Sequence, residues 1–209
     1  MKALQRIYLP VMMLGGLLLS SSFKTTRNAS TDPTPGIYAT YDDYVKHHVT
    51  PYDAIALGHS GFKGTVNGKK APVKEYKNAD AWGAQDENGV IYRFNKKANV
   101  ADRVISNGKV CFYAGMELVV QRFDDGTVKS MTINADNGQK FSELFWVSQG
   151  GEGDMVGASI DNLSSLFADS PALIEKMKAK GIDEKNTKNW VDNFTNVAGW
   201  VGEYDKAHQ

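Results

Sequence analysis

Cysteine, histidine and long apolar runs are scarce in this sequence. Cys111 is the only cysteine, which excludes an intramolecular disulfide. Basic and acidic residues number 24 each, so the chain lacks the excess of positive charge that nucleic-acid-binding proteins carry. The longest apolar run, residues 7–19, is shorter than the ~18 residues that a transmembrane helix needs. The fold must therefore be stabilised by an ordinary hydrophobic core.

Familiar catalytic motifs are also missing. The chain has neither the Gly-x-Ser-x-Gly elbow of serine hydrolases nor the His-Glu-x-x-His helix of zinc proteases. The glycine-rich residues 150–153 lack the Gly-Lys-Ser/Thr of a phosphate loop, and Glu152 and Asp154 would repel an anion, so we expect a flexible connection. The acidic turns lack the glutamate that completes an EF-hand loop, which favours hairpin turns over calcium sites.

Histidines could contribute to a metal site only in one part of the chain. His47 and His48 are adjacent, so on a helix they point about 100° apart and do not readily bind one ion together. His59 could join one of them, with Asp42 or Asp43 supplying oxygen, but no diagnostic ligand spacing is present. We therefore predict no metal site and no cofactor, and we assign no catalytic residue.

Cys111 and two tryptophans complete the set of candidate residues. Cys111 lies within an apolar strand and has no evident activating partner, so we expect a small buried side chain rather than a nucleophile. Trp82 and Trp200 fit no helical stripe. An exposed aromatic ring on a sheet would suit sugar stacking or a protein partner, but packing between helix and sheet is the interpretation that we favour.

The N-terminus predicts export. Lys2 and Arg6 precede the apolar run, and three serines follow it at residues 20–22, an order typical of a signal peptide over residues 1–22 that is cleaved near its last residue. A membrane anchor is the alternative. Residues 23–35, rich in Ser, Thr, Asn and Pro, predict a disordered tether. Cleavage would leave 22 basic against 24 acidic residues and no cysteine for a lipid anchor, so we expect a secreted or periplasmic protein with no stable membrane span.

Residues 81–147 predict an antiparallel meander. Apolar residues alternate at period two, so that Tyr92 and Phe94 share one strand face while Arg93 and Asn95 share the other. Asn-Gly and Asp-Gly pairs separate the segments and favour type I′ turns, in which both central residues have positive φ. These pairs are Asn67-Gly68, Asn88-Gly89, Asn107-Gly108, Asp125-Gly126 and Asn137-Gly138. We therefore expect six to eight strands with one buried face.

The same alternation extends to both ends of this segment. Phe141 and Phe145 are predicted to share one strand face opposite Ser142. Before residue 81 the pattern is less regular, and short strands are expected near residues 55–57, 62–66 and 73–76. A loop is expected over residues 148–157.

Helical signals lie at the two ends of the domain. Thr40 precedes Asp43 by three residues, which is capping-box spacing and predicts a helix over residues 41–47. Three C-terminal helices are expected; the second opens at Ser170-Pro171 and closes at Gly181. The last carries one apolar stripe at gaps of four, three, four and three residues. Its members are Trp190, Phe194, Val197, Val201 and Tyr204.

Two segments carry a family resemblance. Residues 36–40 (Gly-Ile-Tyr-Ala-Thr) precede acidic and aromatic residues, and residues 82–94 read Trp-Gly-x-x-Asp-x-x-Gly-x-x-Tyr-Arg-Phe. Together with Leu166 to Pro171 and the ending Glu203-Tyr204-Asp205, they resemble small secreted β-rich proteins of Bacteroidota. The resemblance covers most of residues 36–205. It implies an exported β-rich protein and carries over no catalytic residue.

Taken together, these signals predict a single α+β domain over residues 36–209, with an antiparallel β-meander sheet packed by C-terminal helices and a short N-terminal helix. Without a catalytic constellation, the leading hypothesis is a non-catalytic binding or envelope-associated module for a protein or glycan. The alternative is a hydrolase of envelope or environmental glycans or peptides that uses carboxylates or His47 and His59. A subunit of an envelope assembly would instead expose an apolar patch above ~600 Å².

Overall fold

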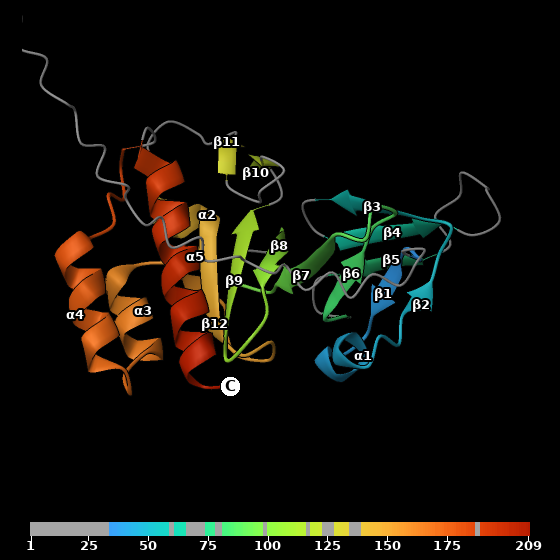
Figure 1. The fold of residues 1–209 in the computed structure, drawn as a ribbon. Helices are drawn as coiled ribbons and strands as arrows, with labels where there is room; N and C mark the ends of the chain where they lie inside the picture. Colours follow the sequence, from blue (N-terminus) through green and yellow to red (C-terminus); the bar gives the residue numbers. More distant parts are fainter. Residues whose placement is uncertain are drawn as a thin grey trace, which may run out of the picture.

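A computed structural model describes residues 34–58, 61–65, 74–77, 81–97, 100–115, 118–122, 128–133, 139–186 and 189–209. The predicted signal peptide and all of the predicted tether except residues 34 and 35 lie outside these ranges. The described chain forms one eight-stranded antiparallel sheet, two smaller sheets and five helices (Figure 1). This architecture confirms the predicted α+β class.

The main sheet contains most of the predicted meander. Its strands are β1 (Gly36–Tyr38), β2 (Thr50–Pro51), β6 (Gly83–Gln85), β7 (Ile91–Asn95), β8 (Val100–Ser106), β9 (Val110–Gly115), β12 (Phe145–Gln149) and β13 (Val156–Gly157). Their spatial order is β13-β12-β9-β8-β7-β6-β1-β2. Strands β6 to β9 are therefore consecutive, whereas β12 joins β9 and β1 joins β6 across longer stretches of chain.

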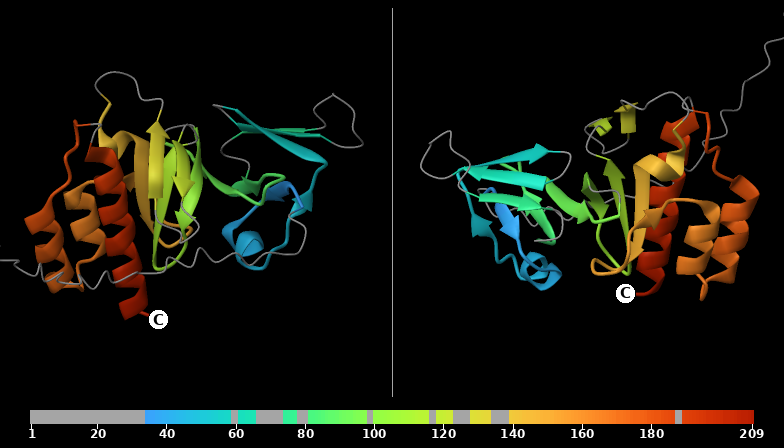
Figure 2. Two further views of the ribbon diagram at one scale, coloured as in Figure 1. Left: turned by 45° about the horizontal axis from the view of Figure 1, so that its top comes forward. Right: turned by 180° about the vertical axis from the view of Figure 1, so that it is seen from behind.

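Two further sheets lie beside the main one. Strands β3 (Ala54–Gly58), β4 (Gly61–Thr65) and β5 (Lys74–Lys77) form one, and β10 (Leu118–Arg122) pairs with β11 (Val128–Ile133) in the other. The strands expected near residues 55–57, 62–66 and 73–76 are thus confirmed, although they form their own sheet. Figure 2 shows this sheet at the end of the molecule opposite the C-terminal helices.

Four of the five helices were predicted, and α2 was not. The five are α1 (Tyr41–Val45), α2 (Phe141–Leu144), α3 (Ile160–Leu166), α4 (Pro171–Lys180) and α5 (Trp190–Ala207). Helix α1 ends two residues earlier than predicted, and His47 adopts a φ of 55° just beyond it. Helix α4 begins with Pro171 and is followed by Gly181 at φ 74°, a left-handed residue that suits glycine.

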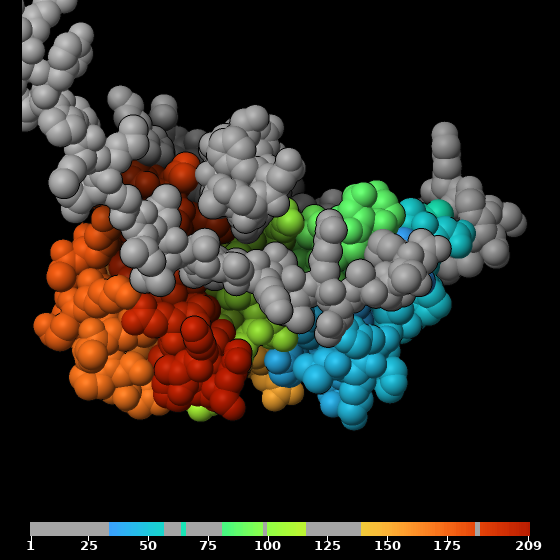
Figure 3. Space-filling model, viewed as in Figure 1, coloured from blue at the N-terminus to red at the C-terminus, as the bar shows by residue number. Residues whose placement is uncertain are grey.

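The largest core lies between α5 and strands β9 and β12 (Figures 1 and 2). All five residues of the predicted apolar stripe of α5 are buried. The Phe194 ring lies 5.3 Å from the Phe112 ring and 5.7 Å from the Phe145 ring, measured between centroids. Trp200, which is off the stripe, is buried in the same core. In the space-filling view, the C-terminal helices and the N-terminal segment lie at opposite ends of the molecule (Figure 3).

The predicted strand at Phe141 is wrong, because these residues form helix α2. Phe141 and Phe145 are four residues apart, a spacing that places side chains on one side of either a strand or a helix. Both rings are fully buried and stacked, with centroids 4.2 Å apart. The sequence therefore located the two core side chains correctly and misassigned the backbone between them.

The predicted type I′ turns are not observed where the structure describes them. Gly89 has a φ of 74°, but Asn88 does not have positive φ; instead, the Asp86 carboxylate accepts hydrogen bonds from the backbone N–H groups of Asn88 and Val90 at 2.9 and 2.8 Å. Gly108 also lacks positive φ. The Asn67-Gly68, Asp125-Gly126 and Asn137-Gly138 pairs lie outside the described residues.

The main sheet is buried on both faces at its centre, whereas the sequence predicts one buried face. Directly paired residues share a face, so Phe94, Ala101 and Ala114 lie on the first face, against the helices and the β3–β5 sheet. The opposite, second face carries Arg93, Asp102 and other buried polar residues. The loop between β12 and β13 and the start of α1 cover part of this second face.

Candidate functional site

A hollow of about 330 Å³ opens on the second face of the main sheet, at the end of β7. Four segments line it: residues 39–41 at the start of α1, residues 81–82 before β6, residues 93–97, and residues 152, 154 and 155. Its volume is at the lower end of the range for small-molecule sites. Because four distant segments build it, no single motif in the sequence could reveal it.

Trp82 forms an aromatic wall of the hollow. Its ring stacks on the Tyr44 ring, with centroids 4.5 Å apart and an interplanar angle of 16°, and the Tyr41 ring lies 5.5 Å away. The indole Nε1 donates a hydrogen bond to the carbonyl oxygen of Gly151 at 2.7 Å. Trp82 remains half-buried while lining the hollow. Packing and this hydrogen bond therefore hold a flat apolar surface in one position.

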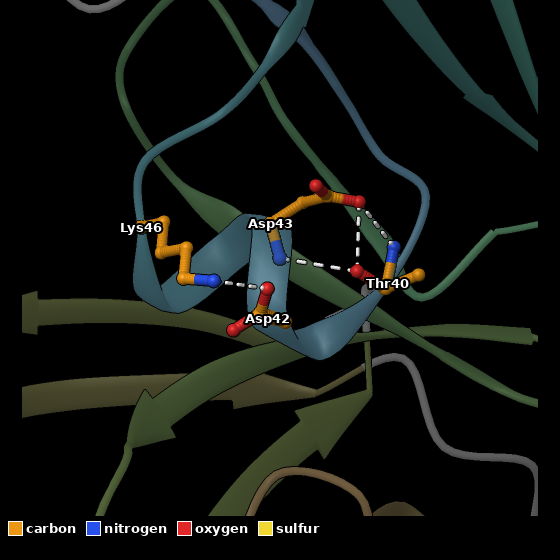
Figure 4. A network of polar contacts seen from close by, with 4 residues as sticks. All are labelled: Thr40, Asp42, Asp43 and Lys46. Atoms are coloured by element: carbon orange, nitrogen blue, oxygen red, sulfur yellow. Dashed lines mark hydrogen bonds and ion pairs between the residues drawn. The ribbon is translucent and has the colours of Figure 1, made fainter.

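The first turn of α1 is fixed by the predicted capping box. Thr40 Oγ1 accepts a hydrogen bond from the backbone N–H of Asp43 at 3.1 Å, and the Asp43 carboxylate accepts one from the backbone N–H of Thr40 at 3.0 Å (Figure 4). The hydrogen bonds from Thr40 lower the pKa of Asp43. Asp42 pairs with Lys46 at 2.7 Å. Both acids that were candidate metal ligands thus stabilise the helix that positions Tyr41.

Arg93 lies on the floor of the hollow and is only 8% exposed. Its Nη1 donates hydrogen bonds to the hydroxyls of Tyr113 and Ser148 at 2.8 and 3.1 Å, and its Nη2 donates one to the carbonyl oxygen of Gly153 at 2.7 Å. The guanidinium carbon lies 5.3 Å from the centre of the Tyr113 ring. Arg93 therefore ties the β12–β13 loop to three strands of the sheet.

Asp102 lies directly opposite Arg93 in the pairing of β7 with β8. Its carboxylate is fully buried, and neither oxygen accepts a hydrogen bond of ordinary length from the described residues. Burial raises the pKa of Asp102 to about 7, because the charged form loses its hydration. Asn95 and Arg93 favour the charged form, and their combined effect is smaller than that of burial.

The glycine-rich loop supplies hydrogen-bond acceptors to the rest of the site. The carbonyl oxygens of Gly150, Gly151 and Gly153 each accept a hydrogen bond from a side chain of Ser148, Trp82 or Arg93, respectively. A phosphate loop presents N–H groups instead, so this geometry does not suit an anion. The expected flexible connection is in fact a hairpin loop between β12 and β13 that is bonded to the sheet.

The mouth of the hollow carries balanced charge. Lys97 Nζ lies 3.0 Å from the Asp154 carboxylate, and both side chains are mostly exposed, at 62% and 81%. Lys96 and Glu152 are also exposed and line the same opening. Two bases and two acids therefore provide hydrogen-bond donors and acceptors without a net charge.

The histidines and the cysteine are not part of this site. His47 and His48 are exposed, and His59 lies outside the described residues. Across the described ranges, no three side chains of His, Cys, Asp or Glu come together as a metal site would require. Cys111 is buried, as the sequence predicts, and burial raises the pKa of its thiol, which opposes formation of a nucleophilic thiolate.

Sequence reasoning missed the buried polar residues of the second face. Arg93 and Asn95 alternate with apolar residues along β7, which is also the pattern of a solvated strand face. Asp102 lies beside Arg103 in the otherwise mostly apolar strand β8, and Ser148 lies near the end of β12. A charged residue placed within an apolar segment on each of two adjacent strands was the available signal, although it does not by itself indicate burial.

No known protein family, curated protein or solved structure matches this chain. The resemblance to secreted proteins of Bacteroidota therefore stays a prediction. Among the helices that the structure describes, none has the length and apolar character needed to cross a membrane.

Proposed function

We propose that this protein is an exported, non-catalytic binding module that holds a neutral sugar ring in the hollow beside Trp82. Export is supported by the sequence of residues 1–22 and by the resemblance to secreted β-rich proteins. Binding is supported by one observation above all: Trp82 is locked in place and half-buried in a hollow whose remaining surface is rich in hydrogen-bonding groups.

The chemistry of the hollow matches that of a sugar. A sugar ring has an apolar C–H face and a rim of hydroxyl groups that both donate and accept hydrogen bonds. The indole offers an apolar surface for the first, and Lys97, Asp154 and Glu152 offer donors and acceptors for the second. Balanced charge at the mouth favours a neutral ligand over an ionic one.

The envelope-assembly hypothesis receives less support. Such a subunit would present a contiguous apolar surface to its neighbours. Among the residues whose side-chain exposure the structure describes, which leave out most of β4, β5, β10 and β11, Val45 is the only large apolar one that is exposed. A concave site therefore explains the surface better than a flat apolar interface does.

Isothermal titration of the full chain with neutral oligosaccharides and peptidoglycan fragments tests the proposal. Trp82→Ala should weaken binding about tenfold or more, because the loss of the stacking contact costs ~1.4 kcal/mol of binding free energy. Tyr52→Ala is the matched control, since Tyr52 packs on the second-largest core and does not line the hollow. Equal affinity of Trp82→Ala and wild type, or no binding to any glycan, would contradict the proposal.

The hydrolase alternative depends on a carboxyl group that reaches the substrate. A pKa of about 7 is what a general acid needs, but Asp102 is fully buried and does not line the hollow. Glu152 and Asp154 do line it. Turnover of a glycan or peptide by the wild type that is abolished in Asp154→Asn or Glu152→Gln would replace the binding proposal with this one.

A further inference from the structure

The cation of Arg93 is buried among neutral partners. Its guanidinium donates hydrogen bonds to the hydroxyls of Tyr113 and Ser148 and to the carbonyl oxygen of Gly153. A buried charge is ordinarily paired with an opposite charge, because neutral acceptors replace only part of its lost hydration. In the observed arrangement, these three hydrogen bonds of the guanidinium all go to uncharged groups.

Asp102 is positioned to be a counter-ion for Arg93. It is the direct cross-strand neighbour of Arg93, and such neighbours have Cβ atoms ~4.5–5.5 Å apart, well within the reach of an arginine side chain. Both carboxylate oxygens are buried, and neither accepts a hydrogen bond of ordinary length from the described residues, although the Asn95 side chain is near enough to favour the charged form. Arg93 thus has two alternative sets of acceptors, the loop with the two hydroxyls or the Asp102 carboxylate.

We propose that Arg93 and Asp102 form a proton-controlled switch that sets the position of the β12–β13 loop. With a proton on Asp102, Arg93 holds the carbonyl of Gly153 and keeps the loop against the sheet, as observed. When Asp102 loses its proton to solvent, the new anion attracts the guanidinium, the bond to Gly153 breaks, and the loop is released. This movement does not depend on the function proposed above. Its effect on a ligand does rest on that function, because residues 152, 154 and 155 of the loop line the hollow.

The surrounding groups leave Asp102 as the residue that titrates near neutrality on this face. On β7, the group that faces Asp102 is the guanidinium of Arg93. On β9, burial raises the pKa of both Tyr113 and Cys111, so both remain neutral near pH 7. At the loop, Lys97 and Asp154 are paired and exposed. The pKa of Asp102, about 7, places the switch within the physiological range.

Trp82 provides a reporter for the loop. Its indole Nε1 donates to Gly151 of the same loop, so release of the loop changes the environment of the indole N–H proton. The experiment follows the indole N–H resonances of the ¹⁵N-labelled full chain by NMR from pH 5.5 to 8.5, with the Trp82 resonance assigned from Trp82→Phe. We expect it to shift with a midpoint near pH 7, as the ratio of protonated to ionised Asp102 changes from about 10:1 at pH 6 to 1:10 at pH 8.

Two variants and one direct titration decide the outcome. Asp102→Asn should hold the Trp82 resonance at its low-pH position, whereas Asp154→Asn, which removes an exposed acid of the same loop, should leave the pH dependence unchanged. If Asp102→Asn does not fold, the ¹³C carboxyl shift of Asp102 in the wild type takes its place. A resonance that is independent of pH, an unchanged profile in Asp102→Asn, or a carboxyl midpoint below 5 or above 9 would overturn the switch.

Failure of the switch and failure of the proposed function give different results. The NMR titration contains no ligand, so a Trp82 shift near pH 7 without glycan binding supports the switch and refutes the binding proposal. Glycan binding together with a pH-independent Trp82 resonance supports the binding proposal and refutes the switch. If both hold, glycan affinity should differ between pH 6 and pH 8 in the wild type and not in Asp102→Asn.

Discussion

Replacing Asp102 with asparagine is expected to remove a large pH-dependent loss of stability. Burial raises the pKa of this carboxyl from 3.8 to about 7 in the folded protein, so the native state binds the proton more tightly than the unfolded chain. Its contribution to stability is therefore greatest below about pH 4, falls as the pH rises toward 7, and is constant above that. At ~1.4 kcal/mol for each pKa unit, the fall is on the order of 4 kcal/mol.

Urea denaturation at pH 4, 5.5, 7 and 8.5 measures this effect. Many carboxyl groups titrate over this range, so the informative quantity is the difference in unfolding free energy between Asp102→Asn and wild type at each pH. We expect that difference to change by up to ~4 kcal/mol in favour of the variant between pH 4 and pH 7, or by ~8–16 °C in Tm for a chain of this length. Asp154→Asn is the control, because its side chain is exposed and its ion pair contributes under ~1 kcal/mol.

Two results would contradict this reasoning. A difference that stays constant with pH would mean that Asp102 has an ordinary pKa in the folded protein and is not shielded from water. A difference that shifts in favour of wild type as the pH rises would mean that the folded state stabilises the anion, with Arg93 already paired to it.

Three substitutions test other parts of the fold by urea denaturation at pH 7. Phe194→Ala should cost about 3–5 kcal/mol, because the ring fills the core under α5; a loss below ~1 kcal/mol would contradict that packing. Asp205→Ala should cost about 1.5–3 kcal/mol, because the carboxylate accepts the backbone N–H of Val110 at 3.0 Å; an unchanged midpoint would exclude this bond. Thr40→Ala should cost ~1 kcal/mol through the lost cap, and Thr40→Ser, which keeps the hydroxyl, should not.

Most of the helices could be predicted from the sequence, for a physical reason. A helix that packs on one side repeats its apolar residues every three or four positions, and α5 does so from Trp190 to Tyr204. Its neighbours carry local stop and start signals, such as Pro171 at the first position of α4 and Gly181 just after its end. These signals act within a few residues, so they predict a helix end without knowledge of the rest of the chain.

The errors occurred where local patterns are ambiguous. A spacing of four residues fits both a strand and a helix, which is why Phe141 and Phe145 were placed in the right core with the wrong backbone between them. The Asn88-Gly89 turn was located correctly, but its geometry depends on the side chain of Asp86, which bonds two backbone N–H groups of the turn. Dipeptide identity alone does not specify such a bond.

The amino-acid sequence by itself determined the α+β class, the C-terminal helices and most of the strands, because periodicity and capping are encoded locally. Only the tertiary structure decided that the polar face of β7 is buried. Arg93 looks like a solvated residue in its own strand, and it becomes a buried one because the β12–β13 loop, some sixty positions later, lies across it and accepts its hydrogen bond through Gly153. The hollow beside Trp82 and the Arg93–Asp102 pair exist because of that long-range contact, which no local pattern specifies.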